Sequence, residues 1–299
     1  MAGNPFDLAD TAAWSGWRAA KLGAAPAAPA ELVVEMADIA TPSPAELAAL
    51  RARLARANMA VYVEARPRPG RDDKAAIRGL AASLGLRQLD HNTLADDDGV
   101  TPLAVQRDGQ RARYIPYTDR PIAWHTDGYY NPPERRVRAL LLHCARPAAA
   151  GGENRLCDAE MLYLRLRDED PGHIAALMRP DAMTIPGNDE EGMIRPATVG
   201  PVFWVDGPAG RGTARLGMRY TARTRNVIWS EEPDVQAAAA ALRRLLDADG
   251  PPVFTARLEA GWGLVSNNVL HTREPFADDP ACPRLLYRAR YHDRIEDQP

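Results

Sequence analysis

Short apolar segments separated by proline and glycine constrain the fold of this chain most. They begin after Ile122, and runs of this length bounded by turn residues predict β-strands. The predicted strands are Val137–Cys144, Val202–Val205, Leu216–Thr221, Val227–Ser230, Val253–Leu258, Gly263–Leu270 and Arg284–Tyr291. Helices are predicted near Asp158–Arg167 and Pro233–Ala248. Many short strands with inserted helices predict a mainly β, α+β chain, with a β-sandwich or a jelly-roll barrel covered by helices. A parallel α/β sheet is disfavoured because strands and helices do not alternate regularly.

The N-terminal third predicts helices and one buried strand. A short helix carrying Trp14 and Trp17 precedes a linker at Gly23–Pro29. Ser43-Pro44-Ala45-Glu46 reads as a capping box with proline in the first turn, which predicts a helix to about Ala57. Met59–Ala65 is a strand candidate, and a second helix is expected over Lys74–Leu84.

Composition excludes several classes of protein. The 37 basic and 40 acidic residues give a net charge of −3, so no global positive field would attract nucleic acid or an anionic membrane. No apolar run reaches the roughly 18 residues that a membrane helix needs, and the first residues do not resemble a signal peptide. Cys144, Cys157 and Cys282 are too few and too scattered for a disulfide framework or a zinc site. We expect a cytoplasmic protein acting on a small molecule, with the oligomeric state, a homo-oligomer included, left open.

The most informative segment is Trp124–Asn131, with the sequence WHTDGYYN. At the end of a strand, His125 and Asp127 would point to the same face, because side chains alternate along a strand. An imidazole beside a carboxylate supplies two of the three ligands in the facial triad of non-haem iron(II) oxygenases. The H-x-D triplet alone is a weak signal, and a strand histidine and aspartate bonded to neighbours is its alternative.

A second cluster of polar residues lies near the C-terminal end of the sequence. His271 closes a predicted apolar strand, and Arg284 follows 13 residues later. On a strand, Arg284, Leu286, Arg288 and Arg290 would share one face. An inward guanidinium needs an anion because it cannot lose its proton, and a carboxylate accepts a bidentate pair from it.

An H-x-D triplet, a distant histidine and a following arginine together resemble the taurine dioxygenase and clavaminate synthase-like superfamily. The resemblance extends from about Ile122 to Tyr291. It implies a double-stranded β-helix, iron(II) held by His125, Asp127 and His271, and molecular oxygen and 2-oxoglutarate as co-substrates. Arg284 would then form a salt bridge with 2-oxoglutarate. On this reading, residues 1–299 form a single catalytic domain. Its parts are an N-terminal helix and linker (1–29), helices and strands (30–121) and the iron-binding core (122–299).

One position departs from the family pattern. The superfamily commonly has Gly-Gly-x-Thr after the first metal strand, and its threonine contacts 2-oxoglutarate. Here Gly151-Gly152-Glu153-Asn154 puts asparagine in that place, and its amide could still donate to a carboxylate.

The substrate pocket is expected to include residues near both motifs. Tyr129, Tyr130 and Asn131 follow the metal strand and could line it, although aromatics there could equally belong to the core. Arg288 could hold substrate, assist 2-oxoglutarate or pair with a protein carboxylate. Because Arg284 and Arg288 bring two cations to one face, an anionic substrate of low molecular weight is predicted.

The predicted activity is hydroxylation of a C–H bond with release of succinate and carbon dioxide. Desaturation or ring formation with the same cofactors stays open, whereas Asp127 argues against halogenation, because related halogenases lack that carboxylate. Two other classes are a non-catalytic descendant that binds a small acid or a protein, and a zinc hydrolase. The intact motif disfavours the first, and zinc-bound water needs no arginine anchor for a dicarboxylate.

Overall fold

The computed structural model describes residues 3–66, 70–91, 96, 98–188, 194–207 and 214–296. The chain divides into two compact units, each assembled from three stretches of sequence. The first unit comprises Met1–Ala25, Trp124–Pro132 and Cys157–Val253. The second comprises Pro26–Ala123, Pro133–Leu156 and Phe254–Pro299. Both units mix helices and strands, as expected for an α+β chain.

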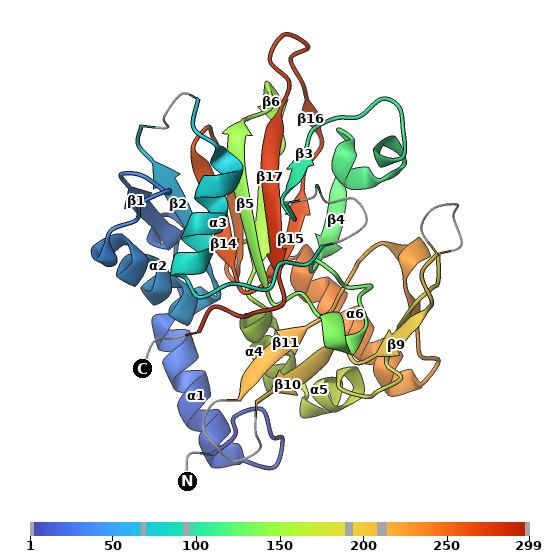
Figure 1. Ribbon diagram of the computed structural model, residues 1–299. Helices are drawn as coiled ribbons and strands as arrows, with labels where there is room; N and C mark the ends of the chain where they lie inside the picture. The colour runs from blue at the N-terminus through green and yellow to red at the C-terminus, as the bar shows by residue number, and fades with distance from the viewer. Residues whose placement is uncertain are drawn as a thin grey trace. The chain divides into compact units, whose positions relative to one another are not determined.

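A six-stranded sheet forms the centre of the second unit (Figure 1). Its strands, in spatial order, are β1 (Val33–Met36), β2 (Met59–Glu64), β14 (Trp262–Ser266), β5 (Ala139–Arg146), β17 (Leu285–Tyr291) and β3 (Thr101–Leu103). β1 and β2 run parallel, and the remaining neighbours pair antiparallel. The long apolar run of β5 is almost wholly buried, as suits a strand with a neighbour on each side and cover on both faces.

Helices α2 (Pro44–Ala57) and α3 (Asp73–Ser83) cover one face of this sheet (Figure 1). The predicted capping box begins α2. The Ser43 backbone N–H donates to Glu46, whose own N–H donates to the Ser43 hydroxyl at 3.3 Å. Leu50 and Leu54 of α2 and Ile77 and Leu80 of α3 pack on Leu141 and its neighbours. Burial of these apolar side chains drives the helices onto the sheet.

The opposite face packs against a second sheet, in the order β13, β7, β15, β4. These strands are β13 (Val253–Ala256), β7 (Asn154–Cys157), β15 (Leu270–Arg273) and β4 (Ile122–His125). Leu142 of β5 and Leu286 of β17 share a buried cluster with Leu156 of β7 and Phe254 of β13. A two-stranded ribbon pairs β6 (Ala150–Gly151) with β16 (Phe276–Ala277).

The prediction of one strand over Gly263–Leu270 is wrong. The chain forms β14 in the six-stranded sheet, then turns and forms β15 in the other sheet. Asn268 takes the left-handed conformation, with φ of 53°, which asparagine tolerates better than most residues. Its amide also donates to the Val137 carbonyl at 2.8 Å, so the turn is fixed by a buried hydrogen bond.

The first unit combines helices with short strands. Its helices are α1 (Thr11–Ala24), α4 (Ala159–Glu169), α5 (Pro171–Leu177) and α6 (Pro233–Asp247). Its strands are β8 (Met183–Ile185), β9 (Thr198–Gly200), β10 (Phe203–Asp206), β11 (Arg215–Met218) and β12 (Ile228–Trp229). Short 3₁₀ turns occupy Pro29–Leu32, Arg111–Arg113, Ile115–Tyr117, Pro133–Arg135 and Thr224–Asn226 across the two units. The predicted helices correspond to α1, α2, α3, α4 and α6, whereas α5 was not predicted.

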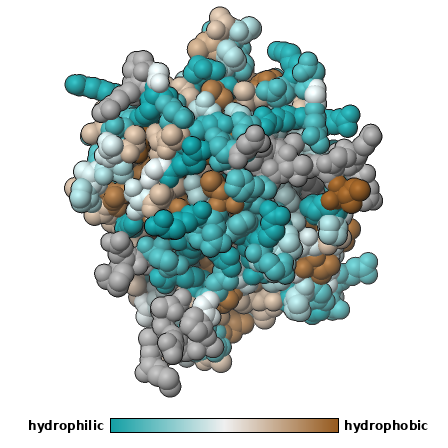
Figure 2. All heavy atoms as spheres, viewed as in Figure 1, coloured by the Kyte–Doolittle hydropathy of each residue, from teal (hydrophilic) through white to brown (hydrophobic). Residues whose placement is uncertain are grey.

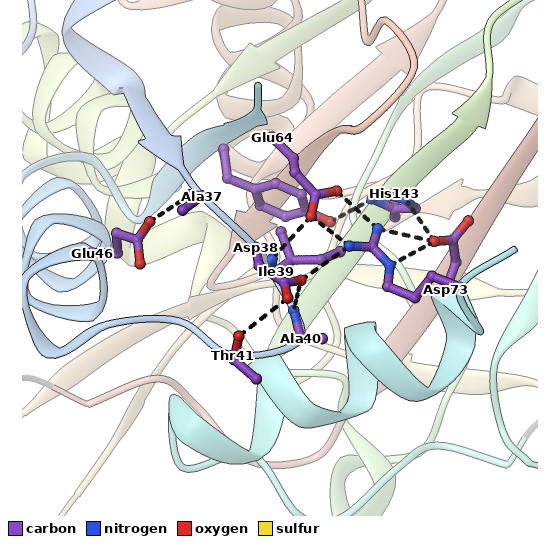
Figure 3. A network of polar contacts seen from close by, with 11 residues as sticks. Ala37, Asp38, Ile39, Ala40, Thr41, Glu46, Glu64, Asp73 and His143 are labelled. Atoms are coloured by element: carbon purple, nitrogen blue, oxygen red, sulfur yellow. Dashed lines mark hydrogen bonds and ion pairs between the residues drawn. The ribbon is translucent and has the colours of Figure 1, made fainter. Parts of the chain in front are cut away.

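A buried polar network lies on the helix side of the six-stranded sheet (Figure 3). The Tyr62 hydroxyl is 3.0 Å from His143 Nδ1, and His143 is 1% exposed. Arg71 forms ion pairs with Glu64 and with Asp73, the latter at 3.0 Å. Burial lowers the pKa of His143, so the ring is neutral at physiological pH. His143 is therefore a buried core histidine with a hydrogen-bond partner.

The surface of the described residues is largely polar. Figure 2 shows hydrophilic side chains over most of the visible face, with hydrophobic ones scattered among them. Large hydrophobic side chains are exposed at Leu22, Ile194, Val199 and Ile228. Among the helices that the structure describes, none is long and apolar enough to cross a membrane.

Candidate metal centre

His125 and Asp127 are positioned by backbone pairing within the first unit. β4 ends at His125, which forms an antiparallel bridge with Thr221. The Thr126 N–H donates to the Tyr220 carbonyl, and the Tyr220 N–H donates to the Thr126 hydroxyl, both at 3.1 Å. Asp127 follows in a turn and is 5% exposed. The expected strand end is therefore present, with the carboxylate just beyond it.

His271 lies on β15 in the second unit and is 5% exposed. Its Nδ1 is 3.1 Å from the Val269 carbonyl oxygen. A carbonyl can only accept, so Nδ1 carries the proton and Nε2 is the unprotonated nitrogen of the ring. A backbone acceptor on the second ring nitrogen is the usual arrangement for a metal-binding histidine, because it fixes the tautomer and the ring orientation.

The three side chains named by the motif form a group that could hold a metal ion. One ligand atom from each of His125, Asp127 and His271 lies within 4.8 Å of the others. Two imidazoles and one carboxylate are the donor set of the facial triad, which suits iron(II). The residues present thus fit the metal that the motif implies.

Arg284 is a buried cation without a carboxylate partner among the described residues. It is 5% exposed, and its guanidinium lies 4.7 Å from the centre of the Phe276 ring. Asp278 is nearby, but its carboxylate accepts the backbone N–H of Arg284. Burial lowers the pKa of Arg284, against the opposing effects of Cys144 and Asp278. A buried charge of this kind is stabilised by an anion that brings its own hydrogen-bond acceptors.

The Gly151-Gly152-Glu153-Asn154 motif lies against Arg284. Both glycines have positive φ, and a Cβ at Gly152 would stand 3.7 Å from Arg284 Nε. A Cβ at Gly151 would overlap the Pro275 carbonyl at 2.3 Å, so only glycine fits there. The Asn154 amide donates to the Thr272 carbonyl at 2.7 Å, which uses one of its two N–H groups. Its contact with 2-oxoglutarate stays a prediction.

Arg273 is a residue that sequence reasoning missed. It is 5% exposed, and its Nη atoms lie 2.5–3.3 Å from four backbone carbonyls, those of Ile115, Pro116, Thr118 and Arg120. Burial, and then Arg284, lowers the pKa of Arg273 to about 9, which still leaves it protonated at neutral pH. Arg273 and Arg284 both contact the Phe276 ring. A charged residue two positions after His271 on a buried strand was the available signal.

The predicted substrate residues are less buried. Arg288 lies on β17 with its side chain half-buried, and Tyr129, Tyr130 and Asn131 are half-buried in the turn after Asp127. The rings of Tyr129 and Tyr130 meet edge to face, with centroids 5.3 Å apart. The Asn131 N–H closes the turn on the Gly128 carbonyl at 2.8 Å. Their roles toward substrate stay predictions.

Comparison with known families gives this geometry a context. The model of the taurine catabolism dioxygenase TauD, TfdA family matches residues 24–290. The chain belongs to this family. The resemblance inferred from the H-x-D…H…R pattern is thereby confirmed, and the chain is a dioxygenase dependent on iron(II) and 2-oxoglutarate.

Two curated relatives and two solved structures show how far the similarity extends. A uridine-5'-phosphate dioxygenase from Streptomyces sp is 34% identical over 200 residues, or 65% of this chain and 70% of the relative. A uridine-5'-phosphate dioxygenase from Amycolatopsis sp is 33% identical over 180 residues, which are 56% of this chain and 60% of the relative. Asparagine oxygenase with Fe(II), hydroxyasparagine and succinate superposes with a TM-score of 0.58 at 16% identity, covering 83% of this chain and 78% of that one. The non-heme iron oxygenase OrfP in complex with Fe and alpha-ketoglutaric acid superposes with a TM-score of 0.58 at 19% identity, covering 86% of each chain. The last two likenesses concern the fold.

The Arg273 contacts predict a stability change. The substitution Arg273→Lys keeps the positive charge. A lysine ammonium could not reach several carbonyls at once, so buried acceptors would be left unpaired. We expect the free energy of unfolding to fall by about 2–4 kcal/mol. The measurement is urea denaturation, with Arg87→Lys, at an exposed position of the same unit, as control. If both variants unfold at the wild-type midpoint, the carbonyl contacts contribute nothing to stability.

Proposed function

We propose that His125, Asp127 and His271 bind iron(II) and that Arg284 binds the far carboxylate of 2-oxoglutarate. The observation that carries the proposal is the approach of the three ligand atoms within 4.8 Å of one another. When bound, the metal with 2-oxoglutarate and oxygen supplies the oxidising chemistry that hydroxylates a C–H bond and yields succinate and carbon dioxide. The protein's part is to hold the metal, to orient the co-substrate and the substrate, and to exclude water from the site.

The chain's own residues would perform these tasks in distinct ways. The Val269 carbonyl holds the His271 ring in the tautomer that leaves Nε2 for the metal. Arg284 is buried, so a carboxylate bound to it would be shielded from water and held by a charge-assisted pair. The Asn154 amide, beside β15, is the candidate for a further hydrogen bond to the co-substrate.

We further propose that the substrate is a small anionic metabolite, with uridine 5′-phosphate as the first candidate. The names of the two relatives, at 34% and 33% identity, support this choice. Arg288, half-buried on the same face of β17 as Leu286, is a candidate to orient the substrate. Tyr129, Tyr130 and Asn131, half-buried in the turn after Asp127, are further candidates to contact it.

The finer description of the fold is part of the proposal. The two packed sheets of the second unit are proposed to form a double-stranded β-helix, which the likeness to asparagine oxygenase and OrfP supports. We propose that residues 1–299 act as one catalytic domain. Each unit consists of three separated stretches, so neither could be released by one cut in the chain.

The metal assignment predicts loss of iron binding. His125→Ala, Asp127→Ala and His271→Ala should each lower bound iron and abolish turnover, because each removes one of only three protein ligands. Iron content and 2-oxoglutarate turnover are the measurements. His173→Ala, whose imidazole lies beside Glu169, is the matched control and should keep both. Wild-type iron content in any of the three variants would refute the assignment of that ligand.

The anchor assignment predicts a higher requirement for 2-oxoglutarate. Arg284→Ala should raise its KM strongly, since losing a desolvated, charge-assisted pair costs about 2–5 kcal/mol. Asn154→Ala should cost on the order of 1 kcal/mol, the value of one hydrogen bond. Arg66→Ala, at an exposed position, serves as the control. An unchanged KM in Arg284→Ala would show that another residue anchors the co-substrate.

The proposed substrate is tested by its effect on the rate of 2-oxoglutarate turnover. Uridine 5′-phosphate should accelerate succinate formation by the iron(II)-loaded enzyme, since in this mechanism substrate triggers the reaction with oxygen. Uridine, which lacks the phosphate, should accelerate it less. No response to uridine 5′-phosphate, together with a response to another small acid, would retain the enzyme class and replace the substrate.

A further inference from the structure

Arg195 is a cation of the first unit for which the sequence suggested no role. Asn188 and Arg195 form an antiparallel bridge in which each backbone N–H donates to the other's carbonyl at 2.8 Å. The Arg195 side chain is half-buried, and its guanidinium donates to the carbonyls of Pro186 at 2.7 Å and Pro196 at 3.1 Å. Among the residues that the structure describes, no carboxylate pairs with it.

The guanidinium lies beside the turn that follows Asp127. Arg195 Cζ is 5.4 Å from the centre of the Tyr130 ring, and Tyr130 is three residues beyond Asp127. The Thr198 hydroxyl donates to the Tyr130 carbonyl at 3.2 Å, which ties the segment of Arg195 to this turn. The cation is thus held next to the stretch of chain that carries two of the proposed metal ligands.

Arg219 of the same unit shows what a purely structural arginine looks like. It is 7% exposed, and its guanidinium donates to three backbone carbonyls, those of Met183, Thr198 and Gly200. Among the described residues, Arg195 has two such acceptors, and part of its side chain is exposed, so these contacts leave N–H groups for an external partner. Burial is the largest cause that lowers the pKa of Arg195, and an anion would offset that cost.

We propose that Arg195, stacked on Tyr130, binds the anionic group of the substrate and so selects phosphorylated over neutral molecules. Phosphate matches the planar guanidinium, which can donate two parallel hydrogen bonds to it. This inference rests on the proposed function, because it concerns the substrate of that same site. It differs from the role suggested for Arg288, which lies on β17 in the other unit.

The test compares ligands that differ only in the phosphate. The dissociation constants of uridine 5′-phosphate and uridine are measured anaerobically on the iron(II)- and 2-oxoglutarate-loaded protein. The proteins are wild type, Arg195→Ala, Arg195→Lys and the exposed control Arg165→Ala. Arg195→Ala should weaken the binding of uridine 5′-phosphate about tenfold to hundredfold. The affinity of Arg195→Lys for uridine 5′-phosphate should lie between those of wild type and Arg195→Ala, because lysine keeps the charge but cannot donate two parallel hydrogen bonds to phosphate. Uridine binding should weaken by a much smaller factor, and Arg165→Ala should match wild type.

Three results would overturn the proposal, and they are distinguishable. Wild-type affinity for uridine 5′-phosphate in Arg195→Ala would remove Arg195 from the site and leave the proposed function intact. Equal weakening of both ligands, with a lower melting temperature, would make Arg195 a structural cross-link like Arg219. If the wild-type protein neither binds nor turns over uridine 5′-phosphate, the proposed substrate fails, and this inference fails with it.

Discussion

The burial of guanidinium groups, which cannot discharge by losing a proton, governs the architecture around the predicted centre. Three buried arginines of the second unit meet this constraint in three ways. Arg290 pairs with the buried Asp90 at 2.5 Å, and Arg273 is surrounded by backbone carbonyls of the segment that leads into β4. Arg284 has neither kind of partner among the described residues, apart from the face of Phe276. One cation is therefore neutralised, one is used as a structural cross-link, and one is left able to receive an anion.

The carbonyl contacts of Arg273 link two parts of the motif that lie far apart in sequence. Arg273 follows His271 by two residues, while the segment it holds runs directly into the strand that ends at His125. The position of one ligand strand thus depends on a side chain from the other. In the same way, Thr126 and Tyr220 exchange hydrogen bonds that fix the residue between His125 and Asp127. The proposed ligands need this support, because three protein side chains orient a metal only if they are already held in place.

Much of the local structure could be predicted from the sequence. The capping box at Ser43 predicted the start of α2, and the apolar runs predicted β2 and β5. These signals could be recognised because each is contained within a few consecutive residues. The break between β14 and β15 was missed, since the apolar run continues through it and only the conformation of Asn268 divides it. The proposed metal ligands and Arg284 were predicted from a spaced pattern of polar and charged side chains. The carbonyl contacts of Arg273 were not predicted, because the acceptors lie more than 150 residues earlier in the chain, although its place two residues after His271 was a signal. The role of Arg195 was not predicted, because the Tyr130 ring that its guanidinium contacts lies 65 residues earlier in the sequence.

The interleaved order of the strands has a consequence for how the protein is made. β5 is a long apolar strand near the middle of the chain, and both of its sheet neighbours, β14 and β17, come from residues 262–291. During synthesis, both hydrogen-bonding edges of β5 therefore stay unpaired until residues 262–291 have left the ribosome. Open edges of apolar strands are sites of aggregation, and long-range pairing is slow. Production of this protein in a foreign host should consequently be limited by the fate of unfinished chains more than by the stability of the finished one.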